Sequence, residues 1–348
     1  MIKIGVRIIF SGLLIAAVLT PPVLAGQSEN PLGVLEFLYW NHPWNNYQYP
    51  NEEAVKKSVQ LMQEAGVGIV RMDFLWGDIE PQYGERHFEK YDFIVDTLTA
   101  AGIEVLGVLS YHTDWASPQC TWNCPNADTS YFVNYCRMVA GHFKDRVHYW
   151  EIWNEPDSAV YWQPQDGLKQ YTALLRDSYQ ALKQVDPDCK VLNGGLANGL
   201  VSVNRMYDNG AQEYFDIFNI HAFETPVAPG AITRIVSYVK TVRKIMARNG
   251  DAHKPLWITE IGCPGVRRGL RVDNWWMGEN PSETEQAAWI KDVVTVLPKQ
   301  PGVRKVFWAF FRDTDEHWKN GTDYFGLIRH DFTKKPSFKK FRDVSHGG

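Results

Sequence analysis

Strand-like runs alternate with helical segments along the chain, and this alternation limits the fold more than any other feature of the sequence. Segments such as EEAVKKSVQLMQEAG and LKQYTALLRDSYQALKQV repeat apolar residues at a spacing of three and four, which is typical of amphipathic helices. Regular strand and helix alternation predicts a parallel sheet of βα units, and eight units predict an α/β fold, a single-domain (β/α)₈ TIM barrel over residues 30–345. The expected strands are 33–40, 68–76, 104–111, 147–154, 190–197, 216–223, 256–262 and 303–311.

The first 25 residues stand apart from this pattern. Two basic residues precede an apolar run from Ile8 to Leu19, and small residues at Val23 and Ala25 suit a signal peptidase. The run is shorter than the roughly 20 residues that a membrane-spanning helix needs, which argues against a retained anchor. We therefore expect a signal peptide over residues 1–25 and an exported, periplasmic or extracellular protein without stable membrane insertion after cleavage.

Charge and composition exclude some classes of partner. The net charge is only −4 and no basic stripe is present, so nucleic acid is not an expected partner. No Cys and His spacing matches a metal site. Aromatic residues make up 14% of the chain, including 14 Trp. Many of these fill the core, but a surplus of Trp also suits stacking against sugars.

Five cysteines are an odd number for an exported protein. Cys120 and Cys124 lie in one loop, QCTWNCPN, where a disulfide would hold the turn together. We expect these two to pair. The other three, Cys136, Cys189 and Cys263, are expected to be buried or free thiols.

Two glutamates follow strands that a barrel would place around one mouth. Glu155 ends the fourth strand run and Glu260 ends the seventh. Catalytic groups of such barrels sit at the carboxyl ends of the strands. Glycoside cleavage needs one acid that protonates the leaving oxygen and another that meets the anomeric carbon, and a retaining pair lies roughly 5 to 5.5 Å apart. The alternative for each glutamate is a helix cap or a pair with an arginine.

The motifs around these glutamates resemble a known group of enzymes. EIWNEP, LWITEIG and VFWAFF resemble clan A of the glycoside hydrolases, which are retaining (β/α)₈ enzymes. WEIWNEPD, VDPDCKVLNGGLA, ETEQAAW and DYFGLIRHDFTKKPSF are similar to glycoside hydrolase family 39 and to related bacterial glycosidases that act on exopolysaccharide. The resemblance covers almost all of the chain after the signal segment. It implies that Glu155 is the acid/base and Glu260 the nucleophile.

The resemblance also implies supporting roles for neighbouring polar residues. The residue matching Asn154 binds the 2-hydroxyl of the sugar in clan A, although a turn-stabilising amide is the alternative. Arg71 lies on the second strand and needs a carboxylate partner inside a barrel. Strand periodicity leaves a pair with Glu151 and a direct contact with Glu260 equally open.

Histidines and one substitution complete the polar candidates. His221 lies on the sixth strand, in NIHAFE. Many clan relatives have an aromatic hydroxyl two residues further on that touches the nucleophile, and this chain has Phe223 there. We expect His221 or another residue to supply the missing hydrogen bond to Glu260. His112, after the third strand, lines the cleft or is an ordinary loop residue.

Tryptophans near strand ends are candidates for sugar subsites. Trp308 matches the clan's floor beneath the reacting sugar, with a place in the barrel core as the alternative. Further tryptophans fall just after strands and could form additional subsites or pack in the core: Trp76, Trp115, Trp162, Trp275 and Trp276. Several such residues favour an endo-acting enzyme on a β-linked polysaccharide or oligosaccharide.

The sequence therefore predicts a secreted retaining β-glycosidase with neither a cofactor nor a metal. An exo-acting β-xylosidase or β-glucosidase is the alternative if the long loop at 263–282 closes one end of the cleft. A barrel that binds carbohydrate without cleaving it is a second alternative. The two glutamates argue against it.

Overall fold

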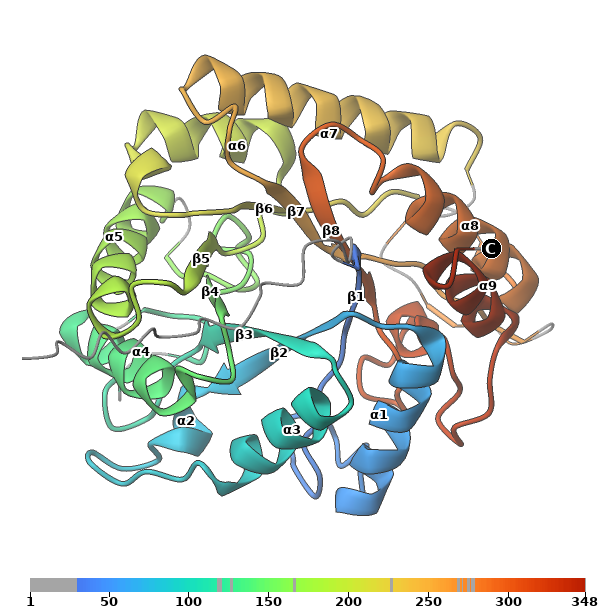
Figure 1. Cartoon of the computed structure of the whole chain (residues 1–348), viewed down its shortest axis with the longest axis horizontal. Helices are drawn as coiled ribbons and strands as arrows, with labels where there is room; N and C mark the ends of the chain where they lie inside the picture. Colours follow the sequence, from blue (N-terminus) through green and yellow to red (C-terminus); the bar gives the residue numbers. More distant parts are fainter. Residues whose placement is uncertain are drawn as a thin grey trace, which may run out of the picture.

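Eight parallel strands form the centre of the computed structural model, and helices surround them (Figure 1). The structure describes residues 30–117, 121–125, 128–164, 167–225, 228–267, 270, 272–273, 276 and 279–347. The predicted signal segment lies outside these residues. Within them, no helix combines the length and apolar character needed to cross a membrane.

The strands follow the predicted order around the barrel, and the (β/α)₈ fold is confirmed. They are β1 (Leu32–Leu35), β2 (Ile69–Leu75), β3 (Glu104–Ser110), β4 (Tyr149–Ile152), β5 (Lys190–Asn193), β6 (Phe218–His221), β7 (Leu256–Ile261) and β8 (Val303–Ala309). Hydrogen-bonded neighbours run β5-β4-β3-β2-β1-β8-β7-β6. Only isolated bridges, such as Leu192 with Ile217, join β5 to β6 and close the ring.

The helices cover the outside of the strands. They are α1 (Glu52–Ala65), α2 (Trp76–Ile79), α3 (Glu89–Ala100), α4 (Ser130–Phe143), α5 (Leu168–Val185), α6 (Gly199–Asp208), α7 (Ala231–Arg248), α8 (Glu283–Val296) and α9 (Pro336–Ser345). Two short 3₁₀ turns, η1 (Ala211–Glu213) and η2 (Gly321–Tyr324), lie between them. Local sequence fixes several helix ends. The Asn51 side chain accepts from the Ala54 amide at the start of α1, and Gly66 ends that helix in the left-handed conformation.

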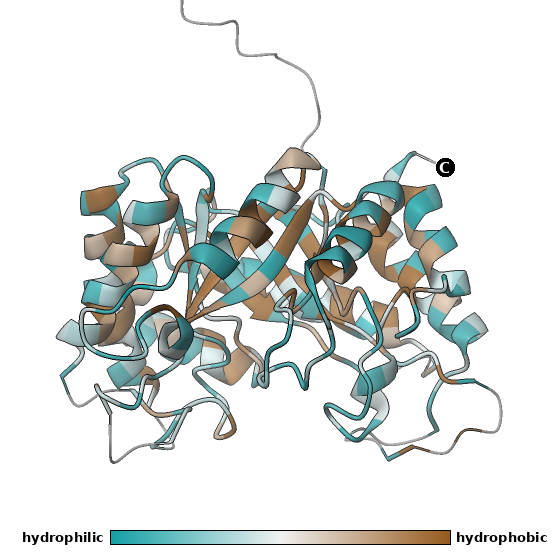
Figure 2. Ribbon diagram, turned by 90° about the horizontal axis from the view of Figure 1, so that it is seen from below, coloured by the Kyte–Doolittle hydropathy of each residue, from teal (hydrophilic) through white to brown (hydrophobic). Residues whose placement is uncertain are grey.

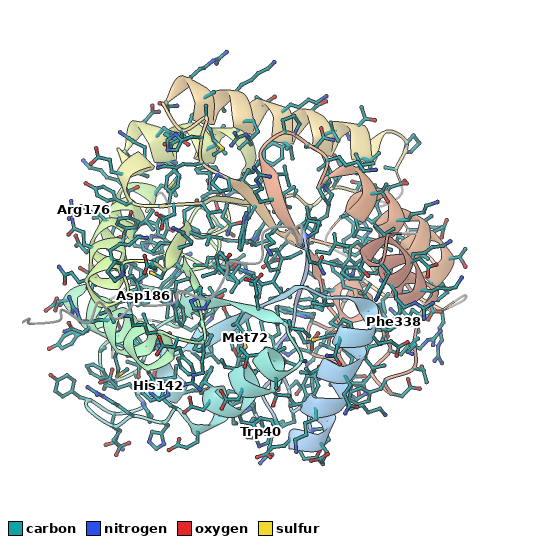
Figure 3. All side chains as sticks on the ribbon, viewed as in Figure 1. Trp40, Met72, His142, Arg176, Asp186 and Phe338 are labelled. Carbon is teal, nitrogen blue, oxygen red and sulfur yellow. The ribbon has the colours of Figure 1, made fainter. Side chains whose placement is uncertain are left out.

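Apolar side chains occupy two layers of the fold. Figure 2 shows hydrophobic residues concentrated on the strands, with hydrophilic residues on the outer helices and loops. Between strands and helices, buried residues such as Met72, labelled in Figure 3, form the large core. At the end of the barrel opposite the carboxyl ends of the strands, a second cluster fills the interior: Ile69, Leu106, Leu192, Ile217, Trp257 and Phe307. Toward the carboxyl ends of the strands, the interior instead carries polar side chains such as Arg71 and Glu151.

All eight strands are shorter than predicted, and beyond β1 a side chain replaces some of the missing sheet bonds. β1 ends at Leu35 rather than near residue 40. The Asn45 amide donates to the carbonyls of Phe37 and Tyr39, so these two carbonyls are satisfied without a neighbouring strand. Apolar runs alone do not reveal such a side-chain substitute.

Candidate active site

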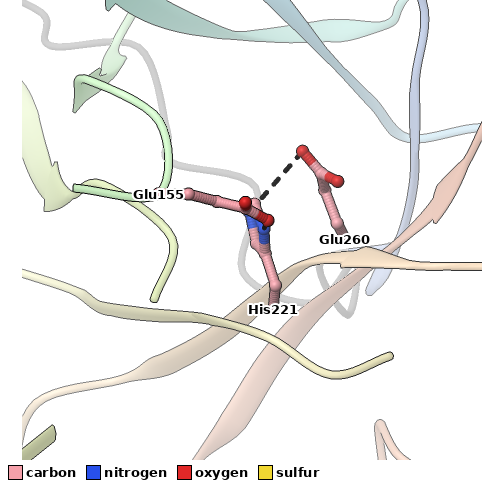
Figure 4. A group of neighbouring side chains, drawn as sticks. All are labelled: Glu155, His221 and Glu260. Carbon is pink, nitrogen blue, oxygen red and sulfur yellow. Dashed lines mark hydrogen bonds and ion pairs between the residues drawn. The ribbon is translucent and has the colours of Figure 1, made fainter. Parts of the chain in front are cut away.

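The carboxyl ends of four strands bring the ionisable residues of the barrel mouth together. Arg71 lies on β2, and Glu151 lies on β4. Glu155 follows the end of β4, His221 ends β6, and Glu260 lies on β7. Figure 4 shows Glu155, His221 and Glu260 directed toward one another from their separate segments. The sequence placed both glutamates at strand ends, and the structure brings them to the same mouth.

A sharp turn after β4 directs the side chains of two consecutive residues, Asn154 and Glu155, into the mouth. Trp153 and Glu155 both adopt left-handed backbone conformations, with φ of 66° and 43°. Such a conformation costs a non-glycine residue on the order of 1–3 kcal/mol, so the surrounding contacts must hold it. The Trp153 indole donates to the Tyr161 carbonyl at 2.7 Å and anchors the turn. In a continued strand, Asn154 and Glu155 would face opposite sides of the sheet.

An irregularity in β7 directs Glu260 toward the mouth. Trp257 packs against Phe307 inside the barrel, and Thr259 donates to Asn219. In a regular strand, the residue after Thr259 would therefore point outward. The register between β7 and β8 shifts between Ile258 and Ile261. This bulge lets Glu260 face inward beside Thr259, as bulges near active sites often do.

His221 lies between the two glutamates. Its Nδ1 is 2.7 Å from Glu155 Oε1, and its Nε2 is 3.6 Å from Glu260 Oε1. One carboxylate oxygen of each glutamate and a ring nitrogen of His221 all lie within 4.8 Å of one another. The glutamate side chains are 13% and 14% exposed, whereas His221 is buried. The two glutamate side chains therefore reach the cleft, whereas His221 contacts them from the buried side.

Arg71 compensates the buried negative charge of this site. Its guanidinium donates to both oxygens of Glu151, at 2.7 and 2.9 Å. It also donates to Glu260 Oε1 at 2.6 Å and to Asn154 Oδ1 at 2.7 Å. Both pairings left open by the sequence are thus present. A buried arginine needs this complete set of partners, because an unpaired charge there is costly.

The surroundings shift the protonation of the mouth residues. Burial raises the pKa of Glu155, although the hydrogen bond and charge of His221 act in the opposite direction. Burial lowers the pKa of His221, but the two glutamates outweigh it and the net pKa is raised. Burial likewise raises the pKa of Asp73 to about 7, against the lowering effect of Arg71. Glu155 and His221 therefore both keep a proton to higher pH than the free side chains do.

The same three residues offer ligand atoms close enough for a metal ion. The guanidinium of Arg71 lies 2.6 Å from Glu260, however, and its positive charge disfavours a cation at that carboxylate. The arrangement of two acids with a histidine between them suits proton transfer better than metal ligation.

Several predicted tryptophans lie in the core instead of the cleft. Trp308 is 1% exposed and donates to the Phe325 carbonyl. Because its neighbour Phe307 faces the barrel interior, Trp308 faces away from it and offers no open ring face to the mouth. Trp76 and Trp162 are also buried; Trp76 packs on Tyr135. For these three, the structure shows the core position that the sequence left as the alternative.

The remaining predicted residues have mixed positions. His112 is partly exposed, 3.3 Å from Asp114, and Trp115 is partly exposed with its indole donating to the Glu80 carbonyl. Trp275 lies outside the described residues. Phe223 has no hydroxyl for Glu260, and Arg71 provides the close hydrogen bond that sequence reasoning sought from His221 or another residue.

The cysteines partly match expectation. Cys124 is disulfide-bonded, whereas its predicted partner Cys120 lies outside the described residues. Cys136, Cys189 and Cys263 are buried and free.

One wall of the mouth is a row of aromatic rings that the sequence did not reveal as a group. Successive centroids are 5.2 to 6.5 Å apart along the row. The residues come from segments that follow β1, β3, β4 and β8: Trp318, Phe310, Phe37, Trp44, Trp122 with Tyr111, and Tyr161. Phe310, two residues after Trp308, is the member nearest β8. Spacing alone could not find this row, because its members are far apart in the chain.

Comparison with known proteins also identifies the chain as a glycoside hydrolase. The family model described as Cellulase (glycosyl hydrolase family 5) matches residues 27–312. The chain belongs to this family. Membership of clan A is thereby confirmed, although the resemblance in sequence motifs pointed to family 39. Within the family, the two glutamates after β4 and on β7 are the natural candidates for its chemistry.

Individual relatives match only parts of their own length. A region of 143 residues is 29% identical to the β-galactosidase BbgII of Bifidobacterium bifidum, covering 34% of this chain and 21% of that protein. A family 39 glycoside hydrolase from the gut symbiont Bacteroides cellulosilyticus WH2 shares the fold with a TM-score of 0.73 at 24% identity, over 91% of this chain and 64% of that one. A monomeric β-xylosidase from Caulobacter crescentus shares it with a TM-score of 0.69 at 17% identity, over 91% and 68%. The chain thus spans about a fifth of the curated relative.

Proposed function

We propose that this protein is an exported retaining β-glycosidase that cleaves a β-linked polysaccharide. The observation that carries the proposal is the close approach of Glu155 and Glu260, whose carboxylate oxygens lie within 4.8 Å of each other. Retaining pairs are separated by roughly 5 to 5.5 Å, whereas inverting pairs need roughly 6.5 to 9.5 Å to admit a water molecule. The spacing therefore favours direct attack by one carboxylate.

In the first step, Glu155 donates its proton to the glycosidic oxygen while Glu260 attacks the anomeric carbon. The carbon–oxygen bond to the leaving sugar breaks, and a covalent ester with Glu260 forms. In the second step, Glu155 accepts a proton from water, the water oxygen attacks the anomeric carbon, and Glu260 leaves as a carboxylate. The raised pKa of Glu155 suits its role as the first proton donor.

The other mouth residues position these two groups. Arg71 holds Glu260 and Asn154 in place, and His221 orients Glu155. We assign Asn154 to the sugar 2-hydroxyl, because its side chain shares Arg71 with the nucleophile. His112 and Trp115 are candidates for more distant contacts with the glycan.

Endo action is supported by the aromatic row along the mouth. Rings of Trp44, Trp122 and Trp318 are at least partly exposed along this wall, so several sugar units could stack on it. An exo-acting β-xylosidase or β-glucosidase would instead need a barrier beyond the reacting sugar. Export is proposed from the N-terminal sequence alone.

The test is product analysis of the protein that begins at Gly26, with β-1,4 and β-1,3 glucans, xylan, mannan and bacterial exopolysaccharides as substrates. We expect short oligosaccharides from one polymer, and none with Glu260→Gln. Proton NMR at early times should show the β-anomer first. An α-anomer as first product excludes the retaining mechanism, and release of single sugars only excludes endo action. Equal binding of a polymer by both proteins, without cleavage, would establish the binding barrel instead.

A further inference from the structure

A second concave surface lies outside the barrel mouth. It is a cavity of about 660 Å³ between α4 and the segment 80–88 that leads into α3. We name it the α4 groove. His142, labelled in Figure 3, lies near one end of it, and Tyr131 lies at the other. Since α4 rises by 1.5 Å per residue, the groove is roughly 16 Å long, which fits a short oligosaccharide.

Aromatic rings form the rim of the groove nearest the mouth. Tyr83, Trp115 and Tyr131 contact one another at centroid distances of 5.1, 5.4 and 6.3 Å. Tyr83 is 75% exposed and Tyr131 is 38% exposed. Large exposed aromatics gathered in one place mark an interaction surface more often than single ones do. The apolar C–H faces of pyranose rings pack well on such side chains.

Side chains on one side of α4 line the rest of the groove. Tyr131, Asn134 and Met138 follow one another at intervals of three and four along α4, so they share one side of the helix. The floor includes Phe88, which stacks on His142 at 3.8 Å. The surface thus combines ring faces with hydrogen-bonding groups, as glycan sites do.

Two arginines and one glutamate line the groove, so the charge of its lining is net positive. Among the described residues, neither Arg86 nor Arg137 forms an ion pair with a carboxylate. Arg137 donates instead to the neutral amide oxygens of Asn134 and Gln184. Glu80 also lines the groove, but its carboxylate already accepts from the Trp76 indole and the Gly84 amide. Guanidinium groups without a carboxylate partner bind carboxylates in a planar, bidentate way.

We propose that the α4 groove binds an acidic oligosaccharide, with sugar rings against Tyr83 and Tyr131 and uronate carboxylates at Arg86 and Arg137. This second site goes beyond the cleavage site and would hold an acidic polysaccharide beside the mouth. The groove proposal rests on the proposed function in one respect only, which is that the ligand is a glycan. Because binding is measured without catalysis, the two proposals can fail separately.

The test uses the Glu260→Gln variant and isothermal titration calorimetry. The probes are a β-1,4-linked mannuronate hexamer and the neutral β-1,4-mannohexaose, which differ in the carboxylate at C6. We expect the mannuronate hexamer to bind at least tenfold more tightly, and raising the salt concentration to weaken it. Arg137→Gln and Tyr131→Ala should each weaken binding by about tenfold or more. Arg248→Gln, at an exposed position on α7, is the matched control and should change nothing.

The opposite results are equally clear. If the groove variants bind the mannuronate hexamer as tightly as the parent, the ligand sits in the mouth and the groove proposal is overturned. Equal affinity for both hexamers overturns the acidic class. Arg86→Gln guards against misfolding, because this exposed side chain forms no hydrogen bond or ion pair with the described residues. If mannuronate binding behaves as expected while the wild-type protein cleaves no polymer, only the proposed hydrolysis fails.

Discussion

Two buried charge clusters in this barrel differ in how completely their polar atoms are satisfied. In the first, Lys335 donates to Asp313, at 2.7 Å, and to the carbonyls of Gly265 and Tyr324. Asp313 also accepts from the Gly326 amide. All three ammonium protons of Lys335 therefore have protein partners. We name this the Lys335 cluster.

The second is the mouth cluster of Arg71, Glu151, Glu155, His221 and Glu260. Each nitrogen of its arginine donates at least one hydrogen bond, but its two outer glutamates remain partly exposed. Both catalytic candidates keep exposed carboxylate surface, and the buried Nε2 of His221 has no hydrogen-bond partner. The contrast shows that burial of charge alone does not mark an active site. A cluster whose outer carboxylate side chains stay partly exposed can meet a substrate, whereas a closed cluster holds the fold together.

The largest expected effect on chemistry comes from Glu260→Gln. This variant keeps the shape of the mouth cluster but removes the carboxylate that we propose as the nucleophile, so kcat/KM should fall by at least about 10⁴-fold. The measurement is hydrolysis of an aryl β-glycoside, with circular dichroism to confirm the fold. Activity within tenfold of wild type would mean that Glu260 is not the nucleophile.

Lys335→Met should lower the free energy of unfolding and leave kcat unchanged. Removing one partner of a buried pair leaves Asp313 uncompensated and costs about 3–5 kcal/mol of unfolding free energy. Urea denaturation measures the loss, and kcat per folded molecule should remain at the wild-type value. A tenfold fall in kcat of the folded fraction would erase the distinction between the two clusters.

Glu155→Gln should discriminate between leaving groups. Without its proton donor, the enzyme should cleave an oligosaccharide about 10²–10⁴-fold more slowly. A dinitrophenyl β-glycoside needs no such donor, so its first step should remain fast, and added azide should restore turnover because it needs no general base. Equal losses on both substrates, without azide rescue, would contradict the acid/base role.

The smallest expected effect, His221→Asn, concerns pH. In the proposed mechanism, activity requires protonated Glu155 and should therefore be lost as pH rises through the raised pKa of that group. His221 acts to lower this pKa, so its removal should move the alkaline limb of kcat/KM to higher pH. Lost orientation should also reduce the rate by on the order of 10- to 100-fold. A rate loss without movement of the limb would show that His221 only positions the acid.

Much of the scaffold could be predicted because its signals are local. The alternation of strands and helices and the two acids at strand ends are visible within short windows. The direction of the Trp308 side chain could not be predicted, because FWAFF is apolar throughout and does not indicate which side chains face the barrel interior. Nor could the sequence show that Arg71 contacts Glu151 and Glu260 at once, because that contact joins three strands. The bulge that directs Glu260 inward also depends on packing between β7 and β8.

The ring of strands is closed differently at one place, between β5 and β6. There the Asn193 and Asn219 side chains exchange hydrogen bonds with each other's backbone, in place of a continuous ladder. His221 lies two residues beyond Asn219. Local opening of this seam would separate His221 from Glu155 while the other strands stay paired. On heating, we therefore expect the enzyme to lose activity at a lower temperature than it loses secondary structure.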